Sequence, residues 1–285
     1  MEIRMTRFFR ILYYLVTIPV SLVILLHSRR IHPAYRLSWL RRIMFGLRVV
    51  RNKHSIPTGG SYKTALVMAL KLFELPPEVP GVVVECGTWK GGTAANLSLA
   101  CQIVGRKLVI CDSFEGLPPM DQLDREAPAY QKGDYCGTFD EVCANITKYG
   151  DISCCEFVRG WFRDTLPHFD QEIVMAYLDV DLEASLNTCV LNLWPHLDKD
   201  GYIFIDEFVI TDYCALFYSE RYWKEHFDRT PPGLIGAGSG LALGEYYVGP
   251  SSERFDHPMQ SSTGAAYTRK SMSGHWTYYP PGISE

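Results

Sequence analysis

Residues 82–92 constrain the fold more than any other stretch of this chain. They read Val-Val-Val-Glu-Cys-Gly-Thr-Trp-Lys-Gly-Gly, and a helical pattern follows. An apolar run that ends in an acid and a glycine-rich turn is typical of a buried parallel strand leading into a helix. Glycines let the backbone approach a ligand closely, and Glu85 can accept hydrogen bonds from that ligand. The spacing Glu-x-Gly-x-x-x-Gly-Gly favours S-adenosylmethionine over a dinucleotide. The predicted cofactor-binding residues of this turn are Glu85, Gly87, Thr88 and Gly91.

Strand and helix patterns alternate along most of the remaining chain. Short apolar runs predict strands at 82–86, 107–111, 155–159, 173–179 and 201–206. Amphipathic or capped segments predict helices at 61–75, 93–104, 138–149, 183–194 and about 213–227. This alternation predicts an α/β fold with a Rossmann-like, doubly wound and mostly parallel sheet. Residues 113–137 are expected to form a loop. Residues Gly236–Gly240 are expected to form a flexible loop beside the active site.

Acids lie at the carboxyl ends of four of these predicted strands. They are Glu85, Asp112, Asp179 and Asp206. Because the carboxyl ends of parallel strands meet at one edge of the sheet, these side chains should lie together where such folds bind ligands. Burying carboxylates costs free energy unless they bind something. Asp112 is therefore expected to accept hydrogen bonds from the cofactor ribose; the alternative is that it caps a turn.

A second set of acids predicts a metal site. Asp179, Asp206 and Glu207 offer three oxygen ligands, which with water suit octahedral Mg²⁺. Such an ion would bind the acceptor hydroxyl and lower its pKa, which gives Asp179 a catalytic role as well. Asp181 could then take the proton as general base. The alternative is that these acids only cap the helices that follow, although their mutual repulsion would then cost stability.

Five motifs follow one another along the chain. They are Glu-x-Gly-x-x-x-Gly-Gly at 85–92, Asp-Ser-Phe-Glu-Gly-Leu-Pro-Pro at 112–119, Gly-Trp-Phe-Arg-Asp-Thr-Leu-Pro at 160–167, Leu-Asp-Val-Asp-Leu-Glu-Ala-Ser at 178–185 and Gly-Tyr-Ile-Phe-Ile-Asp-Glu at 201–207. In this order they resemble the motifs of the macrocin O-methyltransferase family. The resemblance spans residues 61–249 and implies a class I, magnesium-dependent methyltransferase that transfers a methyl group from S-adenosylmethionine to a sugar hydroxyl. It also implies that Ser113 and Trp161 contact the cofactor, alongside Glu85, Gly87 and Asp112.

The N-terminal region differs in charge from the body. Residues 1–54 carry eleven Lys or Arg and one acid, whereas the remainder carries 17 basic and 31 acidic residues. Residues 11–28 contain no Asp, Glu, Lys or Arg, which predicts an apolar N-terminal helix long enough to cross a membrane. We therefore expect a membrane anchor over 1–28, a basic juxtamembrane segment over 29–60, and a body facing the cytoplasm. A cleaved signal peptide and a helix lying in the membrane interface are the alternatives.

The remaining expectations concern organisation and partners. Residues 61–249 should form the methyltransferase domain and 250–285 a C-terminal extension. The nine cysteines are scattered without a Cys-x-x-Cys pair, which indicates free thiols. The expected acceptor is a small-molecule or lipid-linked sugar; no nucleic-acid partner is expected, and a homo-oligomer is possible. Alternative functions are methylation of a catechol-like phenol, or a membrane-tethered protein that binds the cofactor without turnover.

Overall fold

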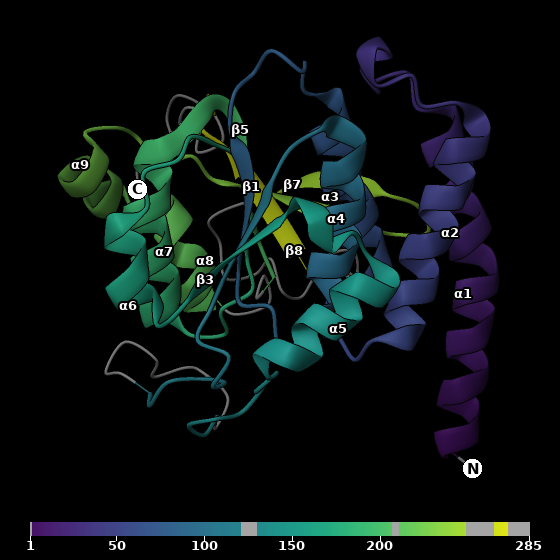
Figure 1. Cartoon of the computed structure of the whole chain (residues 1–285), viewed down its shortest axis with the longest axis horizontal. Coiled ribbons are helices and arrows are strands. Elements are labelled where there is room, and N and C mark those ends of the chain that lie inside the picture. Colours follow the sequence, from purple (N-terminus) through teal and green to yellow (C-terminus); the bar gives the residue numbers. More distant parts are fainter. Residues whose placement is uncertain (1, 121–129, 207–210, 249–264, 273–285) are drawn as a thin grey trace, which may run out of the picture.

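The computed structural model describes residues 2–120, 130–206, 211–248 and 265–272. Its centre is an eight-stranded sheet with the strand order β3-β2-β1-β4-β5-β8-β6-β7 (Figure 1). The strands are β1 Val82–Cys86, β2 Leu108–Asp112, β3 Cys155–Arg159, β4 Ile173–Leu178, β5 Leu197–Ile205, β6 Leu234–Ser239, β7 Gly244–Val248 and β8 Ala265–Arg269.

Strands β1 to β5 pair in parallel, and they form the part of the sheet that the sequence predicted. Strands β1, β2 and β4 have apolar residues at nearly every position, as expected when both faces of a sheet are covered. From β1, the strands β2 and β3 follow one another towards one edge of the sheet, whereas β4 and β5 lie on the other side of β1. The sheet therefore has a topological switch point between β1 and β4, where open α/β sheets bind ligands.

Three antiparallel strands extend the sheet beyond β5. Strand β8 pairs with β5 and with β6, and β7 pairs with the far side of β6. The prediction of a flexible loop at 236–240 is wrong, because residues 236–239 belong to strand β6. Five residues of the sequence beyond 249, those of β8, lie inside the sheet between strands that come much earlier in the chain.

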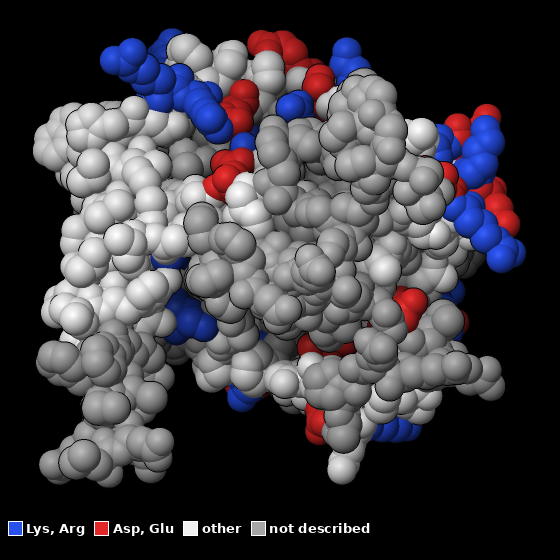
Figure 2. Space-filling model, turned by 180° about the vertical axis from the view of Figure 1, so that it is seen from behind, with Lys and Arg blue, Asp and Glu red and all other residues white. Residues whose placement is uncertain are grey.

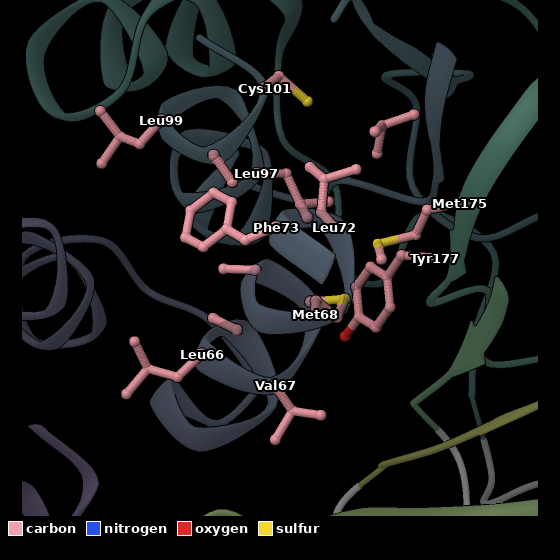
Figure 3. Close-up of a cluster of buried hydrophobic side chains, with 14 of the residues drawn as sticks. Leu66, Val67, Met68, Leu72, Phe73, Leu97, Leu99, Cys101, Met175 and Tyr177 are labelled. Atoms are coloured by element: carbon pink, nitrogen blue, oxygen red, sulfur yellow. The ribbon is translucent and has the colours of Figure 1, made fainter. Parts of the chain in front are cut away.

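Helices cover both faces of the sheet (Figure 1). One face carries α3 Tyr62–Glu74, α4 Gly92–Val104 and α5 Phe139–Tyr149, and the other carries α6 Phe162–Thr165, α7 Glu183–Leu193, α8 Thr211–Ala215 and α9 Glu220–Phe227. The helix predicted at about 213–227 is therefore divided, with a 3-10 turn at Leu216–Tyr218. Figure 3 shows the core on the first face, where Met68 and Leu72 of α3 lie beside Tyr177 and Met175 of β4.

The N-terminal helix α1, Glu2–His27, packs on this first layer of helices rather than standing alone. It lies against α2, Trp39–Ser55, and buries Thr17, Ser21 and Leu25, which recur every four residues along one helical face. The Tyr62 hydroxyl donates to Thr17 Oγ1 at 2.7 Å. Arg42 of α2 donates to the carbonyl oxygens of Leu26 and Ser28 and so ties down the end of α1.

In the described part of the chain, we find no helix with both the length and the apolar character needed to span a membrane. The predicted membrane anchor and the membrane localisation are therefore wrong, whereas the division of this region at residues 28 and 60 stays a prediction. The apolar run misled because α1 also carries apolar side chains on its outer face, among them Leu15 and Val23. In Figure 2 the part of this side that is drawn in white, at the left, carries few charged residues, in contrast to the upper surface.

Candidate active site

The predicted acids converge at the carboxyl ends of the parallel strands, around a cavity of about 480 Å³. Asp112 is the last residue of β2, Asp179 and Asp181 follow β4, and Asp206 follows β5. The cavity is lined by all four of these acids and by three more predicted residues, Gly87, Ser113 and Trp161. Glu85 and Thr88 lie behind the cavity wall, and Gly91 caps the N-terminus of α4. Glu207 lies outside the described residues.

Gly87 occupies the turn where the chain leaves β1. Its φ is +81°, and a Cβ built there would lie 1.9 Å from the carbonyl oxygen of Asp179. Its N–H donates to Cys111 O, while the Asp179 N–H donates to Cys86 O. The glycine thus lets the first turn lie directly against the end of β4, and it leaves the cavity open on this side.

Backbone amides hold Asp112 with its carboxylate at the cavity. One carboxylate oxygen accepts from the Thr88 N–H at 2.7 Å and the other from the Phe114 N–H at 2.6 Å. Burial raises the pKa of Asp112, and these amides, with that of Trp89, act in the opposite direction. An aspartate fixed in this way still has lone pairs that can accept the hydroxyl groups of a ribose.

Glu85 is completely buried behind this turn. Thr88 Oγ1 donates to its Oε2 at 3.1 Å, whereas Oε1 has no hydrogen-bond partner among the described residues. Burial raises the pKa of Glu85 to about 8. A buried acceptor without a donor costs free energy, so Glu85 is prepared for a donor from a ligand or for its own proton.

This burial makes stability depend on pH. Because the pKa of Glu85 is higher in the folded chain than in the unfolded one, the folded state binds more protons between about pH 4.5 and pH 8. The free energy of unfolding should therefore fall as the pH rises through this window. We expect Glu85→Gln to remove this dependence and to raise the free energy of unfolding at pH 8 by a few kcal/mol. Urea unfolding at pH 5 and pH 8 measures this change in the free energy of unfolding, and the variant Glu172→Gln, at an exposed position, is the control. An equal change between the two pH values for wild type and Glu85→Gln would contradict this role of Glu85.

Asp179 and Asp206 are joined through one side chain that the sequence analysis missed. The hydroxyl of Tyr177 lies 2.8 Å from Asp206 Oδ1 and 3.2 Å from Asp179 Oδ2. Tyr177 is fully buried in β4, in the core shown in Figure 3. Tyr177 stands two residues before Asp179, so both side chains lie on the same side of the strand. This spacing is the sequence signal from which Tyr177 could have been identified.

Asp181 completes a carboxylate cluster with Asp179 and Asp206. Its backbone has φ +58°, a left-handed conformation that aspartate adopts more readily than most residues. Burial raises its pKa to about 6, and a hydrogen bond from Tyr130 opposes that rise. The nearby Asp181 charge also raises the pKa of Asp206, after burial as the main cause, while Lys53 lowers it. A carboxylate of this kind can accept a proton near neutral pH.

The described residues test the predicted magnesium site only in part. Among them, no group of three or more His, Cys, Asp or Glu side chains is arranged to hold a metal ion. Asp179 and Asp206 do lie within reach of one hydroxyl group and face the same cavity. Two carboxylates completed by water match the way Mg²⁺ is often held, so the donor chemistry fits this ion.

The cavity also has walls that sequence reasoning did not identify. Gly59 comes from the segment before α3, Trp89 from the turn after β1, and Lys132 and Tyr135 from the segment before α5. Lys132 and Arg163, both exposed, are the basic residues among the lining. An aromatic residue in a glycine-rich turn was a signal for Trp89, whereas the loop 113–137 offered no periodicity from which to place Tyr135.

Curated proteins with similar sequences are O-methyltransferases by name. The chain is 34% identical over 146 residues to 8-demethyl-8-(2,3-dimethoxy-alpha-L-rhamnosyl)-tetracenomycin-C 4'-O-methyltransferase of Streptomyces olivaceus, a match that covers 48% of this chain and 56% of the relative. It is 28% identical, over the same shares, to demethyldecarbamoylnovobiocin O-methyltransferase of Streptomyces niveus. The chain therefore matches just over half the length of these relatives.

Solved structures and a family model agree with this similarity. The O-methyltransferase NovP superposes with a TM-score of 0.54 at 19% identity, covering 89% of this chain and 97% of NovP, and so has the same fold. The family model described as Macrocin-O-methyltransferase (TylF) matches residues 74–231, which include every strand from β1 to β5 and the carboxylate cluster. The resemblance noted in the sequence is thereby confirmed, and the chain belongs to the macrocin O-methyltransferase family.

Proposed function

We propose that this chain is an S-adenosylmethionine-dependent O-methyltransferase that acts on a sugar hydroxyl of a glycosylated metabolite or glycolipid. The observation that carries the proposal is one cavity shared by the glycine turn after β1, the fixed carboxylate of Asp112 and the carboxylate cluster. The name of the Streptomyces olivaceus relative gives a rhamnosyl tetracenomycin and the 4'-O position. Residues 61–249, together with β8, are proposed as the catalytic domain.

The protein residues divide into cofactor-holding and proton-handling groups. Gly87, Asp112, Ser113 and Trp161 would hold S-adenosylmethionine, with Glu85, Thr88 and Gly91 supporting the turn. When bound, this cofactor supplies the methyl group and leaves as S-adenosylhomocysteine. Asp181 takes the proton from the attacking hydroxyl, so that a carbon–oxygen bond forms as the carbon–sulfur bond breaks. Positioning supplies the rest of the rate enhancement.

We further propose that Mg²⁺ assists the reaction. Asp179 and Asp206 would hold it, with Glu207 as a further ligand. The ion would lower the pKa of the acceptor hydroxyl, which is how metals activate weakly acidic alcohols. The support is the pair of carboxylates that share the Tyr177 hydroxyl and face the cavity.

Metal removal tests this part of the proposal. With S-adenosylmethionine labelled in the methyl group and a host extract of glycosides as acceptors, we expect EDTA to lower methyl transfer by at least about tenfold, and excess Mg²⁺ to restore it. A matched titration should leave S-adenosylhomocysteine affinity unchanged, because the cofactor residues are separate from the metal ligands. Equal transfer with and without EDTA would remove the metal from the mechanism.

The same assay separates the alternative functions. Label that enters a phenolic compound rather than a sugar would favour the catechol-like reaction. Tight binding of S-adenosylhomocysteine without transfer to any acceptor would favour a binding protein without turnover. Label in a sugar supports the proposed reaction.

A further inference from the structure

Three aromatic side chains form a row, called here the aromatic wall, that begins at the turn after β1 and reaches Asp181, and two of them line the cavity. The rings of Trp89 and Tyr135 meet edge to face, with centroids 5.5 Å apart, and Tyr130 continues the row 5.8 Å from Tyr135. Trp89 and Tyr135 line the cavity. Tyr130 hydrogen-bonds the carboxylate of Asp181. The aromatic wall, Trp89-Tyr135-Tyr130, therefore ends at the proposed general base.

The backbone fixes this wall in place. The Leu117 N–H donates to Asp134 O at 2.8 Å, and the Gly133 N–H donates to Leu117 O at 2.9 Å. Gly137 lies so close to the first turn that a Cβ there would sit 1.7 Å from the carbonyl oxygen of Trp89. The segment that carries both tyrosines is thus held against the cofactor turn at Gly137 and against Leu117 at Gly133 and Asp134.

The chemistry of the wall suits the apolar face of a sugar ring. Aromatic rings carry partial negative charge on their faces, so they attract the polarised C–H groups on one side of a pyranose. Tyr135 has 46% of its surface exposed, so its ring is accessible to an acceptor. The wall itself bears no formal charge, and Asp181, which Tyr130 contacts, lines the same cavity as Trp89 and Tyr135.

We propose that Trp89 and Tyr135 form the subsite that binds the C–H face of a neutral acceptor sugar, and that Tyr130 positions Asp181 towards its hydroxyl. This inference rests on the proposed sugar O-methyltransferase function and names the acceptor contact within it. The exposed Lys132 and Arg163 at the same cavity define the competing arrangement, in which a phosphorylated sugar is held by charge.

Saturation-transfer NMR with methyl α-L-rhamnopyranoside, in the presence of saturating S-adenosylhomocysteine, tests the subsite. We expect Tyr135→Leu to weaken glycoside binding by about fivefold or more, and Tyr135→Phe to bind like wild type, because the ring face makes the contact. Tyr149→Leu, which removes an aromatic ring remote from the cavity lining, is the matched control and should have no effect. S-adenosylhomocysteine affinity should stay within about twofold in every variant, as expected when no cofactor contact is lost.

Unchanged glycoside binding by Tyr135→Leu would overturn the inference, as would a parallel loss of S-adenosylhomocysteine affinity, which would assign the wall to the cofactor. Preferential binding of rhamnose 1-phosphate, lost in Lys132→Ala, would overturn it in favour of the charged arrangement. Failure of the wild type to bind the glycoside would also overturn it. Tyr135-dependent glycoside binding without methyl transfer would support the subsite while contradicting the proposed function, so the two outcomes are distinguishable.

Discussion

The Asp181→Asn variant is expected to lose at least about 10³-fold in kcat, while S-adenosylhomocysteine binds as it does to wild type. The substitution keeps the size of the side chain, and asparagine also tolerates the left-handed backbone at this position. What it removes is the carboxylate that accepts the proton of the attacking hydroxyl. Single-turnover methyl transfer and calorimetric titration of S-adenosylhomocysteine measure the two effects separately.

Two further variants sharpen this prediction. Asp181→Glu restores a carboxylate with a longer reach, so it should recover part of the lost rate. Asp164→Asn removes an exposed carboxylate on α6, outside the cavity lining, and should leave kcat unchanged. A kcat within about tenfold of wild type for Asp181→Asn would show that the proton leaves by another route.

The Gly87→Ala variant is expected to lose cofactor binding and stability together. Its Cβ would lie 1.9 Å from Asp179 O, and its φ of +81° already disfavours alanine. The turn must move, which disturbs the cofactor contact and the end of β4 at the same time. We expect S-adenosylhomocysteine affinity to fall by at least about a hundredfold and the free energy of unfolding to fall by about 3 kcal/mol or more.

The Gly105→Ala variant separates the effect of a steric clash at Cβ from the effect of the left-handed backbone conformation. Gly105 also has a positive φ, +71°, but nothing lies within 4 Å of a Cβ built there. It should lose only about 1 to 2 kcal/mol of stability and should bind S-adenosylhomocysteine like wild type. If both variants bind the ligand equally well, the turn after β1 does not approach the cofactor as proposed.

The parallel half of the sheet could be predicted from sequence because its strands are short apolar runs closed by acids. Strands β1 and β3 begin and end at the predicted residues, and β2 and β4 differ by one residue at most at either end. The antiparallel half was not predicted. Residues 265–269 become a strand through pairing with β5 and β6, and that long-range pairing has no local signature.

The N-terminal helix was misjudged for a different reason. Its apolar run has no charged face to distinguish a helix packed on protein from one in a membrane. The packed face shows only in three dimensions, where Thr17 and Ser21 are buried against neighbouring helices. Thr17 and Ser21 inside the apolar run were a signal for this packing, because they fall on one helical face and Thr17 accepts a hydrogen bond from the neighbouring helix α3.

Some residues of the candidate site could be predicted from the sequence and others could not, and the difference is whether a strand or a loop positions them. The acids were predictable because strand ends share one edge of a parallel sheet, so sequence position implies spatial neighbourhood. The aromatic wall was not, because Tyr130 and Tyr135 are brought to Asp181 by contacts between irregular segments. Residues that a regular element positions can be read from its period, whereas those that a loop positions depend on the whole fold.

The most direct test of the central claim is to find where the methyl group goes. The full chain, S-adenosylmethionine with a ¹³C-labelled methyl group and a panel of rhamnosides would be incubated, and the products examined by NMR. The account predicts a new ¹³C methyl ether on a sugar oxygen, formed by wild type and lost in Asp181→Asn. Label on nitrogen, carbon or sulfur, or no transfer to any glycoside by a protein that binds S-adenosylhomocysteine, would contradict it.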